Sequence, residues 1–183
     1  MLRSHNVLEK LRSLVYGPDG HPLHPPLTDA TIGAFTLGVV AAVVGWLGIA
    51  EDGMAAAASG GVALGLLLAV PTIGAGFADY LRITRGTPLW RTATAHWLAM
   101  VWAVATFLVA AALLADGWDS GEVSGAGVLV ALAAEALLTL GGWLGGTIVY
   151  VYGMRVLDAP DQPALEAVSP LAADDDDAAA SQG

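Results

Sequence analysis

Apolar residues run along the chain in four long stretches that short polar loops separate. A bilayer core about 30 Å thick needs roughly 20 residues of helix, which rises about 1.5 Å per residue. Since an open sheet edge cannot face lipid, helices are expected for these stretches. The pattern therefore predicts an all-α integral membrane protein, an up-down-up-down four-helix bundle with helices at about residues 27–50, 55–81, 90–115 and 128–152.

The two flanks of this membrane domain differ in character. Near the N-terminus, Val7, Leu8 and Leu11 recur at helical spacing beside basic residues, which predicts an amphipathic juxtamembrane segment. Such a segment would lie on the membrane surface or pack on the bundle or a partner. The C-terminal flank carries prolines and an acidic run, and we expect it to be disordered. The chain is thus expected to divide into residues 1–17, the membrane domain 18–156 and the acidic tail 157–183.

The basic residues fix an expected orientation. All seven Lys and Arg lie before the first stretch, between the second and third, or after the fourth, and the other two loops are acidic. Cytoplasmic loops of membrane proteins are enriched in Lys and Arg. Both termini are therefore predicted to be cytoplasmic, with the lipid bilayer as the main partner of the bundle.

Composition excludes several classes of function. With 56% hydrophobic and 13% charged residues, the chain lacks the polar surface of a soluble domain. It has no cysteine, which excludes disulfides, thiolate zinc sites, iron–sulfur ligation and cysteine nucleophiles in this chain. Its 7 basic against 17 acidic residues offer no face for nucleic acid. No phosphate-binding or nucleophile motif is present, so we do not expect an enzyme.

Small residues mark where helices are expected to approach closely. Gly61 with Gly65, and Gly141 with Gly145, recur at the four-residue spacing of small-xxx-small motifs, and Gly142 and Gly146 form an overlapping pair. We expect these glycines to serve packing within the chain rather than a homo-oligomer, which stays possible. No internal sequence repeat supports the inverted-repeat architecture of transporters.

Several polar residues that are far apart in the sequence are expected to lie at a similar depth in the membrane, as counted along the predicted helices. Asp29, Asp79 and His96 fall near the cytoplasmic boundary of three helices, with Arg91 about a turn beyond. Two more histidines precede the first helix, in a segment whose prolines exclude an ordinary helix interior. The expected polar patch consists of His21, His24, Asp29, Asp79, Arg91, His96 and Tyr150.

One further carboxyl is expected inside the membrane. Glu135 lies in the outer half of the fourth helix, and Thr106 falls at a similar depth on the third. An intramembrane carboxyl is a functional candidate by default. A protonated Glu135 that is hydrogen-bonded to Thr106 or to a backbone carbonyl is an equally adequate structural interpretation.

These residues carry a resemblance to a known family. His21-Pro22-Leu23-His24-Pro25, Gly76 with Asp79, His96, and Gly142-Trp143-Leu144-Gly145-Gly146 with Tyr150 are similar to an uncharacterised bacterial family of four-helix membrane proteins, domain of unknown function 2231. The chain departs from the family pattern at Thr28-Asp29-Ala30. The resemblance implies a multi-pass protein of the bacterial inner membrane. Some members of that family are joined to a Rieske domain, which implies a membrane redox partner.

Three functions are compatible with the expected patch. In the first, Asp79, Arg91 and His96 form an ion-pair and hydrogen-bond network, and the protein is a non-enzymatic accessory or assembly module. In the second, His96 and a histidine of the 21–24 segment ligate haem, or donate hydrogen bonds to a quinone, in a redox-linked module. In the third, His21, His24, His96 and Asp79 bind a metal, or the chain transports metal ions or protons.

Overall fold

The computed structural model describes residues 21–156, 161 and 163. The expected juxtamembrane segment 1–17, and nearly all of the expected tail 157–183, lie outside the described residues. Four of the five described helices are long and apolar enough to cross a membrane. The helices are α2 His24–Trp46, α3 Glu51–Tyr80, α4 Pro88–Leu114, α5 Gly117–Ser120 and α6 Gly125–Tyr150.

The four spans confirm the predicted all-helical architecture, and their N-terminal ends lie a few residues earlier than expected. Helix α2 begins at His24 because Pro25 and Pro26 occupy its first turn, where a missing N–H breaks no helical hydrogen bond. Helix α4 begins in the same way with Pro88, and the hydroxyl of its N-cap Thr87 accepts a hydrogen bond from the backbone N–H of Trp90, 3.1 Å away. His24 is therefore part of a membrane helix and not of a segment outside it.

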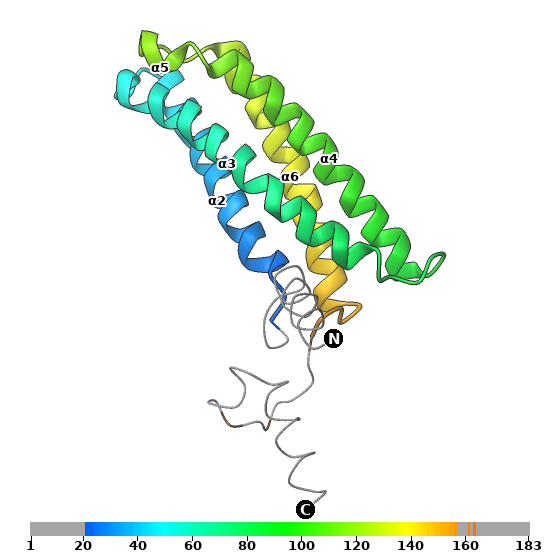
Figure 1. Ribbon diagram of the computed structural model, residues 1–183. Coiled ribbons are helices and arrows are strands. Elements are labelled where there is room, and N and C mark those ends of the chain that lie inside the picture. The colour runs from blue at the N-terminus through cyan, green and yellow to red at the C-terminus, as the bar shows by residue number, and fades with distance from the viewer. Residues whose placement is uncertain (1–20, 157–160, 162, 164–183) are drawn as a thin grey trace, which may run out of the picture.

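The bundle consists of two antiparallel hairpins (Figure 1). The first pairs α2 with α3 and the second pairs α4 with α6, and the hairpins meet where α2 packs on α6 and α3 on α4. Because α2 and α4 start at the same end, the two hairpins run in the same direction. The short helix α5 covers the opposite end, beside the start of α3.

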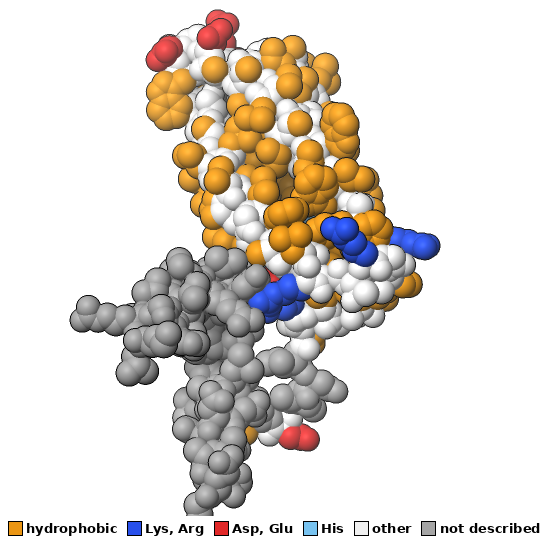
Figure 2. Space-filling model, turned by 45° about the vertical axis from the view of Figure 1, so that its right-hand side comes forward, with side chains coloured by type: hydrophobic (Ala, Val, Ile, Leu, Met, Phe, Trp, Pro, Cys, Tyr) orange, Lys and Arg blue, Asp and Glu red, His pale blue; other side chains and the backbone are white. Residues whose placement is uncertain are grey.

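The outer surface of the bundle is apolar over most of its length (Figure 2). Large side chains such as Leu67, Leu129 and Trp143 point outward with exposed fractions of 70%, 70% and 78%. A water-soluble monomer does not expose so continuous an apolar surface. At one end of the bundle lie the arginine side chains, and acidic side chains lie at the other (Figure 2). We call the first the arginine end, which holds Arg82, Arg85, Arg91 and Arg155, and the second the acidic end.

The two hairpins repeat one another. Phe35 follows His24 by 11 residues on α2, and Phe107 follows His96 by the same 11 on α4. The two phenylalanine rings stack across the bundle centre, with centroids 3.8 Å apart and planes at 9°. Both are fully buried. Because α2 and α4 run in the same direction, the two His-to-Phe segments are parallel and not inverted (Figure 1).

Glycines pack the helices within each hairpin, as predicted. A Cβ atom on Gly61 would lie 2.8 Å from the Cα of Gly38, so α2 and α3 touch backbone to backbone there. The ring of Phe35 lies against Gly65, and Met100 lies against Gly141. By contrast, nothing lies within 4 Å of a Cβ built on Gly142. The pair Gly141 and Gly145 therefore contacts α4, whereas the overlapping pair Gly142 and Gly146 does not.

Candidate functional site

His24 is held against the second helix of its own hairpin. Its Nδ1 atom lies 3.1 Å from the backbone carbonyl oxygen of Thr72 on α3. The imidazole rests on Gly76, where a Cβ would lie 2.6 Å from Cε1 of the ring. Since a carbonyl oxygen only accepts, Nδ1 carries the proton of this hydrogen bond. Any side chain at position 76 would push the ring away from the carbonyl.

His96 occupies the equivalent place in the other hairpin. Its Nδ1 atom lies 2.7 Å from the backbone carbonyl oxygen of Gly141 on α6. The ring rests on Gly145, where a Cβ would lie 3.2 Å from its Cε1 atom. In both hairpins the contacted glycine follows the accepting residue by four positions, which is about one turn. The two histidines therefore make the same pair of contacts, a hydrogen bond to a backbone carbonyl and a packing contact with the glycine one turn later.

We call these two residues, which make the same contact in the two hairpins, the histidine pair. In a neutral ring, a proton on Nδ1 leaves the lone pair on Nε2. Neither Nε2 atom makes a hydrogen bond within the described part of the chain. A backbone carbonyl that fixes Nδ1–H is also the usual partner behind a histidine that binds a metal through Nε2. The pair thus presents two nitrogen ligands, each already oriented.

Asp79 lies at the end of α3 and pairs with an arginine other than the expected one. Its Oδ1 atom is 3.7 Å from Nε of Arg155, and the Asp79 side chain is 14% exposed. Arg155 reaches it because the chain turns back after α6, with positive φ at Gly153 and at Arg155 itself. The expected network of Asp79 with Arg91 and His96 is therefore wrong, since His96 binds a carbonyl and Arg91 is exposed.

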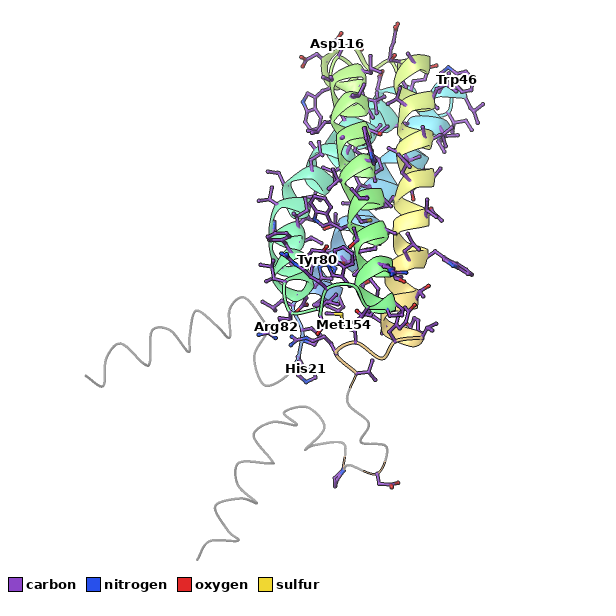
Figure 3. The ribbon with its side chains drawn as sticks, turned by 90° about the vertical axis from the view of Figure 1, so that its right-hand side faces the viewer. His21, Trp46, Tyr80, Arg82, Asp116 and Met154 are labelled. Carbon is purple, nitrogen blue, oxygen red and sulfur yellow. The ribbon has the colours of Figure 1, made fainter. Side chains whose placement is uncertain are left out.

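The remaining members of the expected patch are not gathered around the histidine pair. Asp29 is exposed, and Tyr150 has an exposed fraction of 89%, so neither side chain faces the interior. His21 is exposed too and precedes α2, at the arginine end of the bundle (Figure 3). The predicted depth of these residues in the membrane placed them at the correct end of the bundle. Their side chains nevertheless point away from the interior.

Glu135 lies between the hairpins and binds a different threonine from the expected one. The hydroxyl of Thr36 on α2 donates to its Oε1 atom at 2.8 Å. Thr106 instead donates to the carbonyl of Trp102 on its own helix. The second carboxyl oxygen of Glu135, Oε2, is buried without a hydrogen-bond partner in the described region. One of the two carboxyl oxygens of Glu135 therefore has a hydrogen-bond partner, which lies across the contact between α2 and α6.

We expect the bond between Thr36 and Glu135 to be separable from the packing around it. Thr36→Val removes the donor and should lower the free energy of unfolding by about 1 kcal/mol, because the carboxyl then stays buried without any partner. Replacing both partners, Thr36→Val with Glu135→Leu, should restore stability close to the original value, since no polar group is left unpaired.

The measurement is unfolding in mixed detergent micelles, followed by circular dichroism. Thr106→Val is the matched control, because that hydroxyl binds only its own helix and its loss should change little. A double variant less stable than Thr36→Val would contradict the interpretation of the pair as a replaceable hydrogen bond.

Sequence reasoning missed the polar contacts that support the histidine pair. The hydroxyls of Thr31 and Thr72 lie 2.8 Å apart, and both residues are buried. Thr72 also donates to the carbonyl of Leu68 at 2.7 Å, so its helix carries a fixed polar spot beside His24. The equal spacing from histidine to phenylalanine on α2 and α4 is the one sequence signal that would have matched His24 with His96.

A cluster of protein ligands for a free metal ion is not formed by the described residues. No three His, Asp or Glu side chains among them come close enough to hold one. The expected set of His21, His24, His96 and Asp79 is thus not assembled. Two histidines remain, which is an incomplete set for most metal ions. Two such nitrogens would suffice for a haem iron, because the porphyrin would supply its other ligands.

Comparison with known proteins identifies a family. A family model described as "Predicted membrane protein (DUF2231)" matches residues 20–158, which include the whole described bundle. No curated protein and no solved structure matches the chain.

Proposed function

We propose a function from the premise that this chain belongs to the DUF2231 family of predicted membrane proteins. It is a redox-linked membrane module in which His24 and His96 bind a haem iron through their Nε2 atoms. A haem held in this way accepts and gives up one electron. The module is an accessory to a membrane redox partner, for which a Rieske protein remains our prediction, and is not itself an enzyme.

A single observation supports this proposal most strongly. The repeat places two histidines in equivalent positions, and each fixes its Nδ1 on a backbone carbonyl and keeps Nε2 available. A structural histidine needs only the carbonyl bond, whereas both histidines here also keep Nε2 without a hydrogen bond in the described part of the chain. His24 and His96 would each supply one nitrogen ligand to a haem iron, which would carry the electron.

The same geometry does not favour a quinone. A neutral histidine with its proton on Nδ1 offers a lone pair at Nε2, so it cannot donate to a quinone carbonyl. Asp79, which a quinone site would use to exchange protons, is ion-paired with Arg155. The nitrogen atoms of the histidine pair therefore suit a haem iron better than a quinone.

The test is the absorption spectrum of the full chain, purified in mild detergent from cells supplied with haem precursor. A Soret band with about one haem per chain is expected, in the low-spin form that two nitrogen ligands give. Protein without a Soret band, or with a transition metal and no porphyrin, would overturn the proposal.

We also propose that the arginine end of the bundle faces the cytoplasm of a bacterial cell. The support is that the arginines of the described residues gather at one end, whereas the loops at the other end carry acidic residues and no Lys or Arg (Figure 2). Because the chain has no cysteine, a single introduced one reports its own location without background.

Two single-cysteine variants test this orientation. Ser120→Cys, in α5 at the acidic end, should react with a membrane-impermeant maleimide in spheroplasts. Thr84→Cys, in the exposed loop between α3 and α4, should react only after lysis. The reverse pattern would show that the arginine end faces outward.

A further inference from the structure

The turn between α3 and α4 holds a pocket that the histidine pair does not explain. The pocket has a volume of about 300 Å³ and opens outward at the arginine end. Its lining combines aromatic, apolar and basic side chains: Tyr80, Leu81, Ile83, Arg85 and Trp90. It lies where a helix leaves the apolar zone, and so at the level of lipid headgroups.

The walls of this pocket are held in place. The hydroxyl of Tyr80 lies 3.0 Å from the hydroxyl of Thr94, which ties α3 to α4. Trp90 belongs to the first turn of α4, whose N-cap is Thr87. Between them the chain turns sharply, with φ of +83° at Gly86. The pocket is therefore built by two helix ends and a tight turn.

The pocket carries a positive charge that no carboxylate among the described residues neutralises. Within the described residues, Arg85 has no ion-pair partner. The N-terminal turn of α4 adds the positive end of a helix dipole. Arginine binds phosphate oxygens in bidentate fashion, and tryptophan and tyrosine rings sit at the headgroup level of membranes. Leu81, with an exposed fraction of 64%, adds an apolar side chain to the lining.

We propose that this pocket binds the phosphate headgroup of an anionic phospholipid of the same leaflet. Arg85 pairs with the phosphate, Tyr80 and Trp90 enclose the glycerol region, and Leu81 contacts the start of an acyl chain. Basic pockets at helix ends on the cytoplasmic side bind acidic lipids in this manner. The site is separate from the histidine pair and does not depend on haem.

Native mass spectrometry of the full chain in detergent tests the proposal, with phosphatidylglycerol, phosphatidylcholine and inorganic phosphate as separate probes. We expect phosphatidylglycerol to be retained in preference to phosphatidylcholine. Arg85→Gln should weaken its binding about fivefold, as expected for one arginine near the membrane surface. Arg91→Gln removes the same charge one turn into α4, outside the pocket lining, and should leave binding nearly unchanged.

Three results would overturn the proposal. Equal losses in Arg85→Gln and Arg91→Gln would show general attraction to a basic surface rather than a pocket. Displacement of the lipid by inorganic phosphate would identify free phosphate as the ligand. Unchanged binding in Arg85→Gln would remove the arginine from the site. Circular dichroism of each variant confirms that the exposed substitutions keep the bundle folded.

Discussion

Replacement of either histidine of the pair, His24→Ala or His96→Ala, is expected to weaken haem binding strongly, and replacement of both to abolish it. Each variant removes one of two axial nitrogens, and the remaining histidine alone leaves the iron with an open position. The Soret band of the purified protein should fall to background in the double variant. In the single variants it should fall at least about tenfold, the size of effect seen when a metal loses supporting ligands.

His21→Ala is the matched control, because His21 precedes α2 and is exposed. It should bind as much haem as the unsubstituted chain. Gly76→Ala provides a second, independent variant that keeps both histidines. Its Cβ would lie 2.9 Å from Nδ1 of His24, so it should displace the ring and weaken the spectrum while the helices stay intact.

An alternative role of the histidine pair gives a different result. If His24 and His96 only fasten the helices of each hairpin, their alanine variants should lose helical structure, and the unsubstituted protein should bind no haem. Circular dichroism and the haem absorption spectrum, measured on the same samples, therefore distinguish a haem-binding role of the histidine pair from a purely structural one.

Gly61→Val is expected to cause the largest loss of stability among the glycine variants. Its Cβ would lie 2.8 Å from Cα and 2.9 Å from N of Gly38, both backbone atoms that cannot move without separating α2 from α3. Overpacking at such a contact costs about 3 kcal/mol. The two helices of the first hairpin would have to part along their tightest crossing, because no flexible side chain is there to give way.

Gly74→Val on the same helix is the control for this substitution. Nothing lies within 4 Å of a Cβ at that position, and the residue is exposed. Its free energy of unfolding in mixed micelles should stay within about 0.5 kcal/mol of the original. Similar losses for the two variants would show that valine in α3, rather than the contact with Gly38, is responsible.

The spans could be predicted from the sequence because the bilayer sets their length. The loops are short and polar, so the four long helices and their alternation followed from hydropathy alone. Each of these helices begins two to four residues earlier than predicted, in α2 and α4 with prolines in the first turn, and the short helix α5 was not predicted. The close contacts of Gly61 and Gly145 were also predictable, since a helix pair in lipid approaches through its smallest residues.

The site was predicted only in part. The position of a residue along a helix gives its depth in the membrane but does not show whether its side chain faces the bundle interior or the lipid. The spans are apolar on all sides, so no hydrophobic face shows which residues point inward. Asp29 therefore seemed a member of the patch but is exposed, whereas His24 lies inside and meets α3. The partner of Asp79 depends on the backbone turn at Arg155, and a positive φ at a non-glycine residue is not visible in the sequence.

The shared direction of α2 and α4 is the arrangement that duplication of a two-helix unit would produce. Tandem duplication of a gene segment that encodes an even number of spans returns the chain to its starting compartment, so the second copy inserts in the same sense as the first. Had the ancestral unit contained an odd number, its copies would be inverted, and His24 and His96 would have been stranded in opposite leaflets. A two-span ancestor that assembled as a homodimer would already have carried both imidazoles across one axis.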